Sequence, residues 1–265
     1  MIEQAKITNM TKSDPVGTEY YSPLRSAEIG SEVLFYTAAA LSIGALQVDK
    51  ATYPAAYDGV QSLFAVSVLA VFVLSLAVRL YWSTRAHGKR VSDFISSAFD
   101  VALISQPSSG YYNNAEVEPF RRVAASLMEN ALFSKSILQK MLLSERIKVA
   151  IYAVLWLFAA LTRTTDLALI ATVAQVIFSE QIISRWIRME WLRNRVEQVY
   201  EDIYSLVQPT SNRNTKEFKA RTVEYLIRYE TGKAQAGISL STRLFKRLNP
   251  VLTRQWNETA RRLNI

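Results

Sequence analysis

Four apolar runs, in two pairs around a polar middle, constrain the fold of this chain more than any other feature. They cover residues 33–48, 60–82, 147–161 and 167–187. About 20 apolar residues cross a hydrocarbon core about 30 Å thick, and the second run reaches that length with one charge, Arg79, near its end. The first and third runs are shorter, so each also fits a buried helix of a soluble bundle. Because short connections join the runs in pairs, we expect two hairpins and four spans.

Basic residues predict the orientation of these spans. The hairpin tips hold one each, Lys50 and Arg163. The other ends of the runs are flanked by many more: Arg25, Arg79, Arg85, Lys89, Arg90, Lys140, Arg146, Lys148, Arg185 and Arg188. Since Lys and Arg near span ends stay in the cytoplasm, we expect both termini and residues 84–146 to be cytoplasmic. The first residues lack the apolar segment of a signal peptide, and the chain has no cysteine for disulfides.

The polar parts have helix signals and no strand pattern, so the expected fold class is an all-α polytopic membrane protein. Its expected segments are an N-terminal cytoplasmic segment (1–31), a first hairpin (32–83), a cytoplasmic helical segment (84–146), a second hairpin (147–187) and a basic helical domain (188–265). We expect the second run to continue as a helix through Asp100. A loop then precedes a helix that begins near Phe120 and enters the third run.

Further helix boundaries follow from caps and breakers. The fourth run has no breaker at its end, so its helix is expected to reach Pro209. Asn214 or Thr215 is a candidate cap of the next helix. Residues 239–249 predict a short helix, and Pro250 predicts a new start. The stretch 13–23, rich in turn formers, predicts a loop against the cytoplasmic face.

Apolar residues beyond the fourth run keep nearly the spacing of a coiled seam. They are Trp186, Met189, Val196, Val199, Ile203 and Leu206. One interpretation is a helix packed on its own cytoplasmic domain. The other is a stalk at the symmetry axis of an oligomer.

Polar residues inside the spans are functional candidates, because burying them in lipid costs free energy unless they face a partner or water. Thr165, Thr172, Gln175 and Ser179 share one face of the fourth run. They suit either interhelical hydrogen bonds within one subunit or the lining of a pore in an oligomer. Four spans enclose little of a channel alone, so a pore requires a homo-oligomer, with a tetramer as one candidate assembly.

The net charge of +8 lies entirely in the last third of the chain. Residues 184–265 contain 16 basic and 8 acidic residues, and the rest of the chain is balanced. Basic faces bind phosphates, so either anionic lipid or a nucleotide is a candidate ligand. The candidate ligand-binding residues are Arg243, Lys246, Arg247, Arg254, Trp256, Arg261 and Arg262, with Tyr225 and Tyr229 as further stacking candidates.

Enzyme chemistry has little support in the sequence. The single histidine, His87, has no partner that spacing suggests, and no catalytic, metal-binding or phosphate-loop motif is present. We expect no cofactor and no catalytic residue. Asp93 and Asp100 stand seven residues apart, which suits a carboxylate pair, solvated charges or partners for Arg121 and Arg122.

Several stretches carry a family resemblance. They are FISSAFDVALI (94–104), GYYNN (110–114), FRRVAASLMENALFSKSILQKM (120–141) and the tail from Leu226 to Leu263. From about Glu32 onward, this order resembles the four-transmembrane effectors encoded beside nucleotidyltransferases in bacterial antiphage systems, of the CBASS or Hailong kind. The pattern carries onto seven residues without assigning their roles: Phe99, Asp100, Tyr111, Tyr112, Asn113, Glu129 and Ser134.

The resemblance implies an inner-membrane effector, controlled by a cyclic nucleotide or short oligonucleotide, that disrupts the membrane and arrests growth. A nucleotidyltransferase encoded nearby is then the implied partner. The expected function is therefore an oligomeric pore under nucleotide control. The alternative is a non-conducting membrane scaffold whose basic tail docks a partner protein or anionic lipid. A small transporter has less support, because Gly44 is the only mid-span glycine.

Overall fold

The computed structural model describes residues 13–111, 116–162, 167–177, 179–209 and 213–265. Within these ranges the chain is helical without a named strand, which confirms the all-α expectation; one isolated bridge joins Ser13 to Ser109. The elements are η1 (Gly17–Tyr21), α1 (Ser22–Gln47), α2 (Pro54–Ala77), η2 (Val78–Ser83), α3 (Thr84–Phe99), α4 (Pro119–Leu161), α5 (Leu167–Ile177), η3 (Glu180–Ser184), α6 (Arg185–Val207), α7 (Lys216–Ala236) and α8 (Thr242–Leu263), where η marks a π-helical turn.

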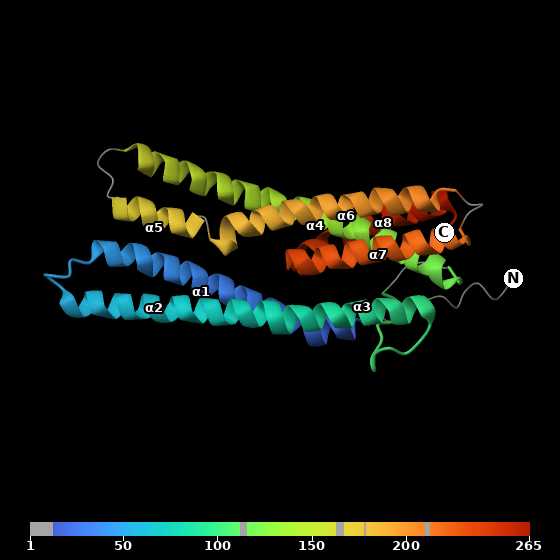
Figure 1. The fold of residues 1–265 in the computed structure, drawn as a ribbon, viewed down its shortest axis with the longest axis horizontal. Helices are drawn as coiled ribbons and strands as arrows, with labels where there is room; N and C mark the ends of the chain where they lie inside the picture. The colour runs from blue at the N-terminus through green and yellow to red at the C-terminus, as the bar shows by residue number, and fades with distance from the viewer. Residues whose placement is uncertain (1–12, 112–115, 163–166, 178, 210–212) are drawn as a thin grey trace.

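The helices lie roughly along one long axis and divide the molecule into two ends (Figure 1). The hairpin of α1 and α2 occupies one end, beside the last part of α4 and α5. The other end, here called the polar end, contains α3, the first part of α4, α6, α7 and α8. The two ends are continuous, because α2, η2 and α3 form one helical stretch of 46 residues and α4 alone has 43.

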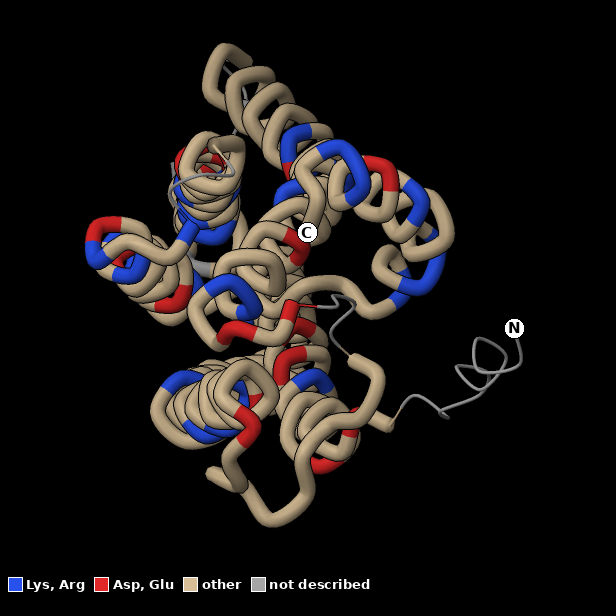
Figure 2. Tube along the Cα trace, turned by 90° about the vertical axis from the view of Figure 1, so that its right-hand side faces the viewer, with Lys and Arg blue, Asp and Glu red and all other residues tan. Residues whose placement is uncertain are grey.

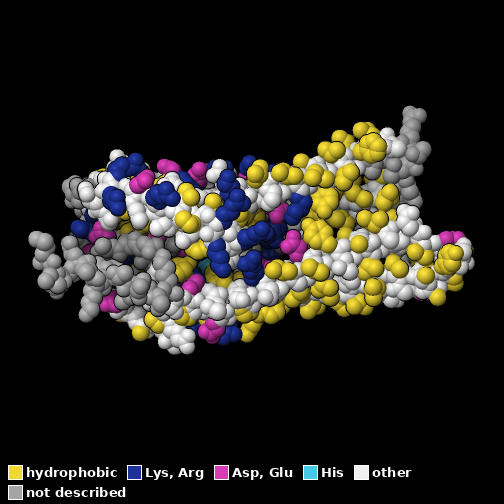
Figure 3. Space-filling model, turned by 180° about the vertical axis from the view of Figure 1, so that it is seen from behind, with side chains coloured by type: hydrophobic (Ala, Val, Ile, Leu, Met, Phe, Trp, Pro, Cys, Tyr) yellow, Lys and Arg dark blue, Asp and Glu magenta, His cyan; other side chains and the backbone are white. Residues whose placement is uncertain are grey.

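Two helices of the described residues are long and apolar enough to cross a membrane: Gly17–Gln47 and Pro54–Phe99. Only 11% and 6% of their most apolar windows are buried in the structure. The core helix of a soluble bundle would be mostly covered, so these helices expose apolar surface that water disfavours. On the face seen in Figure 3, apolar side chains are spread over this half of the molecule, and Lys and Arg gather where it meets the polar end.

The main core lies in the polar end. Leu127, Met128 and Leu138 of α4 and Met189 and Val199 of α6 are each fully buried in one cluster that also receives side chains from α7 and α8. Each such residue contributes about 1.5–3 kcal/mol when it leaves water, so this cluster is what holds the polar end together. Around it, charged positions are distributed over the circumference of this end (Figure 2).

Several helix boundaries agree with the sequence-based expectations. The helix of the second run continues to Phe99, and Asp100 ends it with a left-handed φ of 56°. Glu118 caps α4 by accepting a hydrogen bond from the Arg121 backbone N–H, and Thr215 caps α7 in the same way for Phe218.

Three expectations about boundaries were wrong. Residues 239–249 and the stretch after Pro250 form one helix, α8, because Leu248, Leu252 and Trp256 keep an apolar face across the proline while Pro250 itself is exposed. The N-terminal stretch is helical from Pro15 instead of a loop. The fourth run is interrupted inside its own length, because α5 ends at Ile177 and η3 precedes α6; from η3 onward the helix passes the end of the run without a break and reaches Val207, as expected.

Candidate functional site

The cations of α8 form an ordered stripe. Arg243, Arg247, Arg254 and Arg261 follow at i, i+4, i+11 and i+18, which places them on one helical face, and Lys246 flanks them. All five side chains are exposed. With a rise of 1.5 Å per residue, this stripe is about 27 Å long. We call these five residues the α8 stripe.

Little negative charge opposes the α8 stripe. Between residues 231 and 265 the only acidic residue is Glu258. Within the described part of the chain, no ion pair joins a stripe residue to a carboxylate. Arg262 stands beside the stripe with its guanidinium 5.7 Å from the centre of the Tyr204 ring. The stripe is therefore a surface with five cations whose charges are available to an anion.

The direction of α8 separates two candidate ligands. Just before α8 begins, Ser239 Oγ donates to Glu28 Oε1 of α1 at 2.7 Å, at the border between the two ends. At the far end of α8, Arg213 donates to the carbonyl oxygens of Leu263 and Asn264, beside the connection from α6 to α7. The stripe thus runs away from the apolar end instead of along its border (Figure 1). A lipid surface would reach only the first residues of such a stripe.

The aromatic candidates do not belong to this surface. Trp256 is fully buried among α4, α6 and α8, and Tyr229 is buried with its hydroxyl 2.7 Å from Ser134 Oγ. Tyr225 packs against the same core on α7. The structure therefore corrects the prediction that Trp256 stacks on a ligand: its ring is needed for the core that positions α8.

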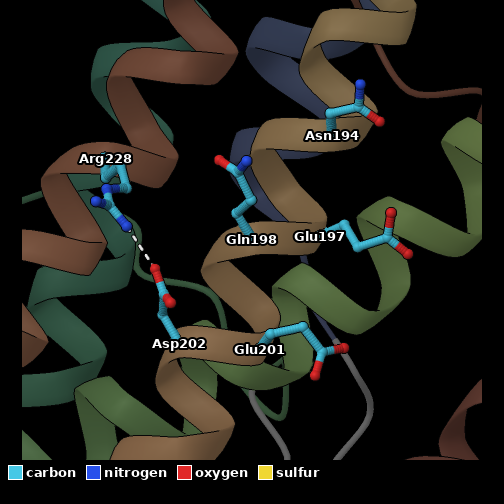
Figure 4. A pocket seen from close by; sticks show the side chains of 6 residues that line it. All are labelled: Asn194, Glu197, Gln198, Glu201, Asp202 and Arg228. Carbon is cyan, nitrogen blue, oxygen red and sulfur yellow. Dashed lines mark hydrogen bonds and ion pairs between the residues drawn. The ribbon is translucent and has the colours of Figure 1, made fainter.

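A depression of about 520 Å³ lies elsewhere on the polar end, between α6 and α7. Its lining is Asn194, Glu197, Gln198, Glu201, Asp202 and Arg228 (Figure 4). The one cation, Arg228, is paired with Asp202. With Asp202 neutralising this guanidinium, Glu197 and Glu201 remain as two further carboxylates that disfavour a phosphate, so this depression is not a candidate nucleotide site.

A second charged group is largely buried where α3 meets the N-terminal segment. Arg90 Nη2 lies 2.9 Å from the Asp14 carboxylate, and Arg90 Nη1 lies 3.3 Å from Asp93 Oδ2. Asp93 is 1% exposed and also accepts the Ser108 backbone N–H at 2.8 Å. The Arg90 guanidinium stacks 4.6 Å from the centre of the Tyr111 ring. This network ties the segment around Asp14, α3 and the loop after α3 together.

The network continues from α3 to α7. His87 Nε2 lies 3.4 Å from Glu230 Oε2, and Lys233 Nζ lies 3.3 Å from the same oxygen. Burial lowers the pKa of His87, although the Glu230 carboxylate opposes this. His87 therefore has a partner that the sequence did not reveal, since 143 residues separate the two.

The expectation for Asp93 also needs correction, because it pairs with Arg90 and not with Arg121 or Arg122.

The residues of the family resemblance have separate environments. Glu129 is buried in α4, and Ser134 bonds Tyr229. Tyr111 covers Arg90, while Phe99 meets Phe120 edge-on at 5.6 Å and Asp100 only ends α3. Tyr112 and Asn113 lie outside the described residues. The structure thus places Glu129 and Ser134 in the interior of the polar end, whereas Tyr111 is half-buried over Arg90.

The candidate pore residues are placed only in part. Gln175 is exposed and Thr172 half-buried on α5. Ser179 follows α5, and its buried hydroxyl oxygen has no hydrogen-bond partner within the described residues. Thr165 lies outside those residues. In contrast, Met189, Val196, Val199 and Ile203 of the predicted seam are fully buried in the core of their own chain, which supports the intrachain interpretation.

No protein family, curated protein or solved structure matches this chain. Sequence reasoning found the cations of α8 but missed the buried network around Arg90. The local signal was the Arg90–Asp93 spacing of three residues on a helix; Asp14 and Glu230 carry no such signal.

Proposed function

We propose that this protein is a membrane effector whose cytoplasmic helices bind a nucleotide or short oligonucleotide and thereby control a homo-oligomeric pore in the inner membrane. The observation that supports this best is the α8 stripe, with five exposed cations along about 27 Å of helix. A mononucleotide would occupy only part of that length. A chain of several phosphates matches it better, since each phosphate can meet one cation.

The proposed membrane domain has four spans. The α1–α2 hairpin supplies two of them. Beyond Ile147, α4 carries large exposed apolar side chains, among them Val154, Phe158 and Leu161, and α5 lies between this part of α4 and α1. Such side chains favour lipid over water. The basic residues that flank these helices favour an orientation with both termini in the cytoplasm.

Control of a pore requires that the ligand binds two states with different affinity. The polar end offers a mechanical route, because α3 is continuous with α2 and joined to α7 through His87 and Glu230. Both α7 and α8 pack on α4 in the core, which links them. A shift of α8 on ligand binding would therefore reach the second span through α7 and α3. Symmetry-related copies around the membrane normal would amplify that shift.

The test is conductance of the purified full chain in planar bilayers, with and without a mixture of cyclic and linear oligonucleotides. We expect a current that changes with the oligonucleotide. The double variant Arg254→Glu with Arg261→Glu should abolish the response and still insert into the membrane. The matched control is Lys216→Glu with Arg221→Glu, which changes the net charge equally but lies on α7.

Salt dependence sharpens this test. For a single strand, the logarithm of the binding constant falls linearly with the logarithm of the salt concentration, with a slope of about −0.7 for each phosphate contact. The double variant of the α8 stripe should therefore reduce the slope by about 1.4, and the α7 control should leave it unchanged. Unchanged binding by the stripe variant would overturn the ligand site. Silence in all conditions from inserted protein would favour the non-conducting scaffold, whose partner would be an acidic protein surface.

A further inference from the structure

Two π-helical turns face each other where the apolar end meets the polar end. One is η1, at the start of the first candidate span, and the other is η2, at the end of the second apolar run. The elements pack together, since α1 contacts η2 and η1 contacts α3. A π-helical turn widens the backbone and re-aims its side chains, and such turns are frequent at functional sites.

A cavity of about 180 Å³ lies between these turns. Its lining is Glu19, Tyr20, Pro23, Tyr81, Trp82 and Arg85. Tyr20 and Glu19 come from η1, Tyr81 and Trp82 from η2, and Arg85 from the first turn of α3. The wall is thus mainly aromatic, with one cation and one carboxylate.

Arg85 is held in place without being neutralised. Its Nη1 donates to the Tyr81 hydroxyl at 2.9 Å, and its guanidinium lies 5.2 Å from the centre of the Tyr20 ring. No carboxylate of the described chain pairs with it. Lys89 Nζ lies 5.9 Å from the same ring. A guanidinium has five N–H donors, so Arg85 retains donors for an anion.

The length of the apolar run indicates where this cavity would lie along the membrane normal. From Val60 to Trp82 the helix rises about 33 Å, close to the thickness of a hydrocarbon core. Tyr81 and Trp82 therefore end the span, at the level where Tyr and Trp sit among lipid headgroups. Tyr81 is 55% exposed, so the cavity opens toward that layer.

We propose that this cavity is a phospholipid headgroup site. The phosphate of the lipid is bound by Arg85, with Lys89 adding positive charge. The aromatic walls pack against the glycerol and headgroup carbons. Glu19 lies where it would meet the ammonium group of an amine-bearing headgroup. This inference rests on the proposed membrane orientation but not on the pore or on the α8 stripe.

The experiment uses the full chain, delipidated in detergent and titrated with dilauroyl phosphatidylethanolamine. Native mass spectrometry measures the bound lipid, and thermal unfolding measures the stabilisation. Dilauroylglycerol has the same chains without the phosphate, and inorganic phosphate provides the free anion. We expect binding of the phospholipid, no saturable binding of dilauroylglycerol, and no protection by inorganic phosphate at the same concentration.

Variants test the assigned residue. Arg85→Ala should weaken phospholipid binding about tenfold, as expected for loss of a charge-assisted hydrogen bond, and Arg85→Lys should recover part of it. The matched control is Lys50→Ala, which removes a cation 5.4 Å from the Tyr57 ring at the opposite end of the hairpin. Helicity by circular dichroism establishes that each variant is folded.

Three outcomes would overturn the proposal. Equal binding of dilauroylglycerol would show that the acyl chains alone are recognised. Equal protection by inorganic phosphate would make the cavity an anion site without lipid. Unchanged binding by folded Arg85→Ala would remove the residue from the site. A failure of nucleotide-dependent conductance would affect none of these results, so the two proposals fail separately.

Discussion

Arg90 and Asp14 join two segments that are 76 residues apart, with Arg90 Nη2 2.9 Å from the Asp14 carboxylate. The side chain of Arg90 is 13% exposed and its second partner, Asp93, is 1% exposed. A guanidinium between two carboxylates in such a place is costly to remove, because the buried carboxylate then loses its counterion. The pair therefore fixes the segment around Asp14 on α3.

Arg90→Ala should lower the free energy of unfolding by about 3 kcal/mol. Thermal and chemical unfolding of the detergent-solubilised protein measures this change. The control is Arg193→Ala, whose partner Glu197 is a partly exposed neighbour one turn away on α6. Such surface pairs contribute about 0.3–0.5 kcal/mol. Equal losses from the two variants would contradict a structural role of the Arg90 network.

Tyr229 and Ser134 provide a second test of the interior. The Tyr229 hydroxyl lies 2.7 Å from Ser134 Oγ and donates to the Asn130 carbonyl oxygen at 3.3 Å. Tyr229→Phe should lower the free energy of unfolding by about 1 kcal/mol, the usual net value of one hydrogen bond. Ser134→Ala should cost a similar amount.

The double variant Tyr229→Phe with Ser134→Ala should lower the free energy of unfolding by less than the sum of the two single variants. When both partners are apolar, neither leaves a buried polar group unpaired. A double-mutant cycle measured by chemical unfolding gives this coupling directly. Strict additivity would indicate that the two hydroxyl groups do not interact in solution.

Local patterns in the sequence were sufficient for much of the fold. Periodicity within one helix reveals the apolar run ending at Trp82 and the spacing of Met189, Val196 and Ile203. The cap residue Thr215 is likewise a local signal, because its residue type is favoured directly before a helix. The cations of α8 were found for the same reason. Their exposure on one face follows from the helical period, and the structure adds the direction of the stripe.

The remaining features depend on contacts between distant segments. His87 contacts Glu230, and Arg90 contacts Asp14, only after the helices have packed. Their separation in the sequence follows no pattern that would predict such pairs. The cavity between η1 and η2 was also missed, because π-helical turns have no clear sequence signal here. Pro250 misled the prediction of α8 because local propensity favours a break, whereas packing of the apolar face on both sides favours continuity.

Pro250 provides the third prediction. It lacks the N–H that would bond the Lys246 carbonyl oxygen, and a proline inside a helix costs about 3 kcal/mol. Pro250→Ala should therefore raise the free energy of unfolding by about 1 kcal/mol or more, after loss of the proline's restriction on the unfolded chain. Thermal unfolding measures it. Pro209→Ala, in the connection after α6, should give no such gain, and a destabilised Pro250→Ala would mean that the restriction of the unfolded chain by the proline outweighs the hydrogen bond missing from α8.

The pH dependence of stability tests the contact between α3 and α7. His87 lies beyond the apolar run, and burial lowers its pKa while the Glu230 carboxylate raises it and Lys233 lowers it. The unfolded chain has the ordinary value of about 6.5, so it binds a proton at higher pH than the folded chain does. The stabilisation from neutral His87 is complete above this value and is lost as the pH falls through the folded pKa.

We therefore expect the free energy of unfolding to decrease between pH 7.5 and pH 5, and His87→Gln to reduce that decrease. Chemical unfolding across this range compares the two proteins, with Lys50→Ala as a control far from Glu230. An identical decrease in His87→Gln would assign the pH dependence to the carboxylates instead. A gain in stability of the unmodified protein on acidification would mean that attraction between protonated His87 and Glu230 outweighs burial, which would make this contact tighter at low pH and reverse its effect on the coupling of α3 to α7.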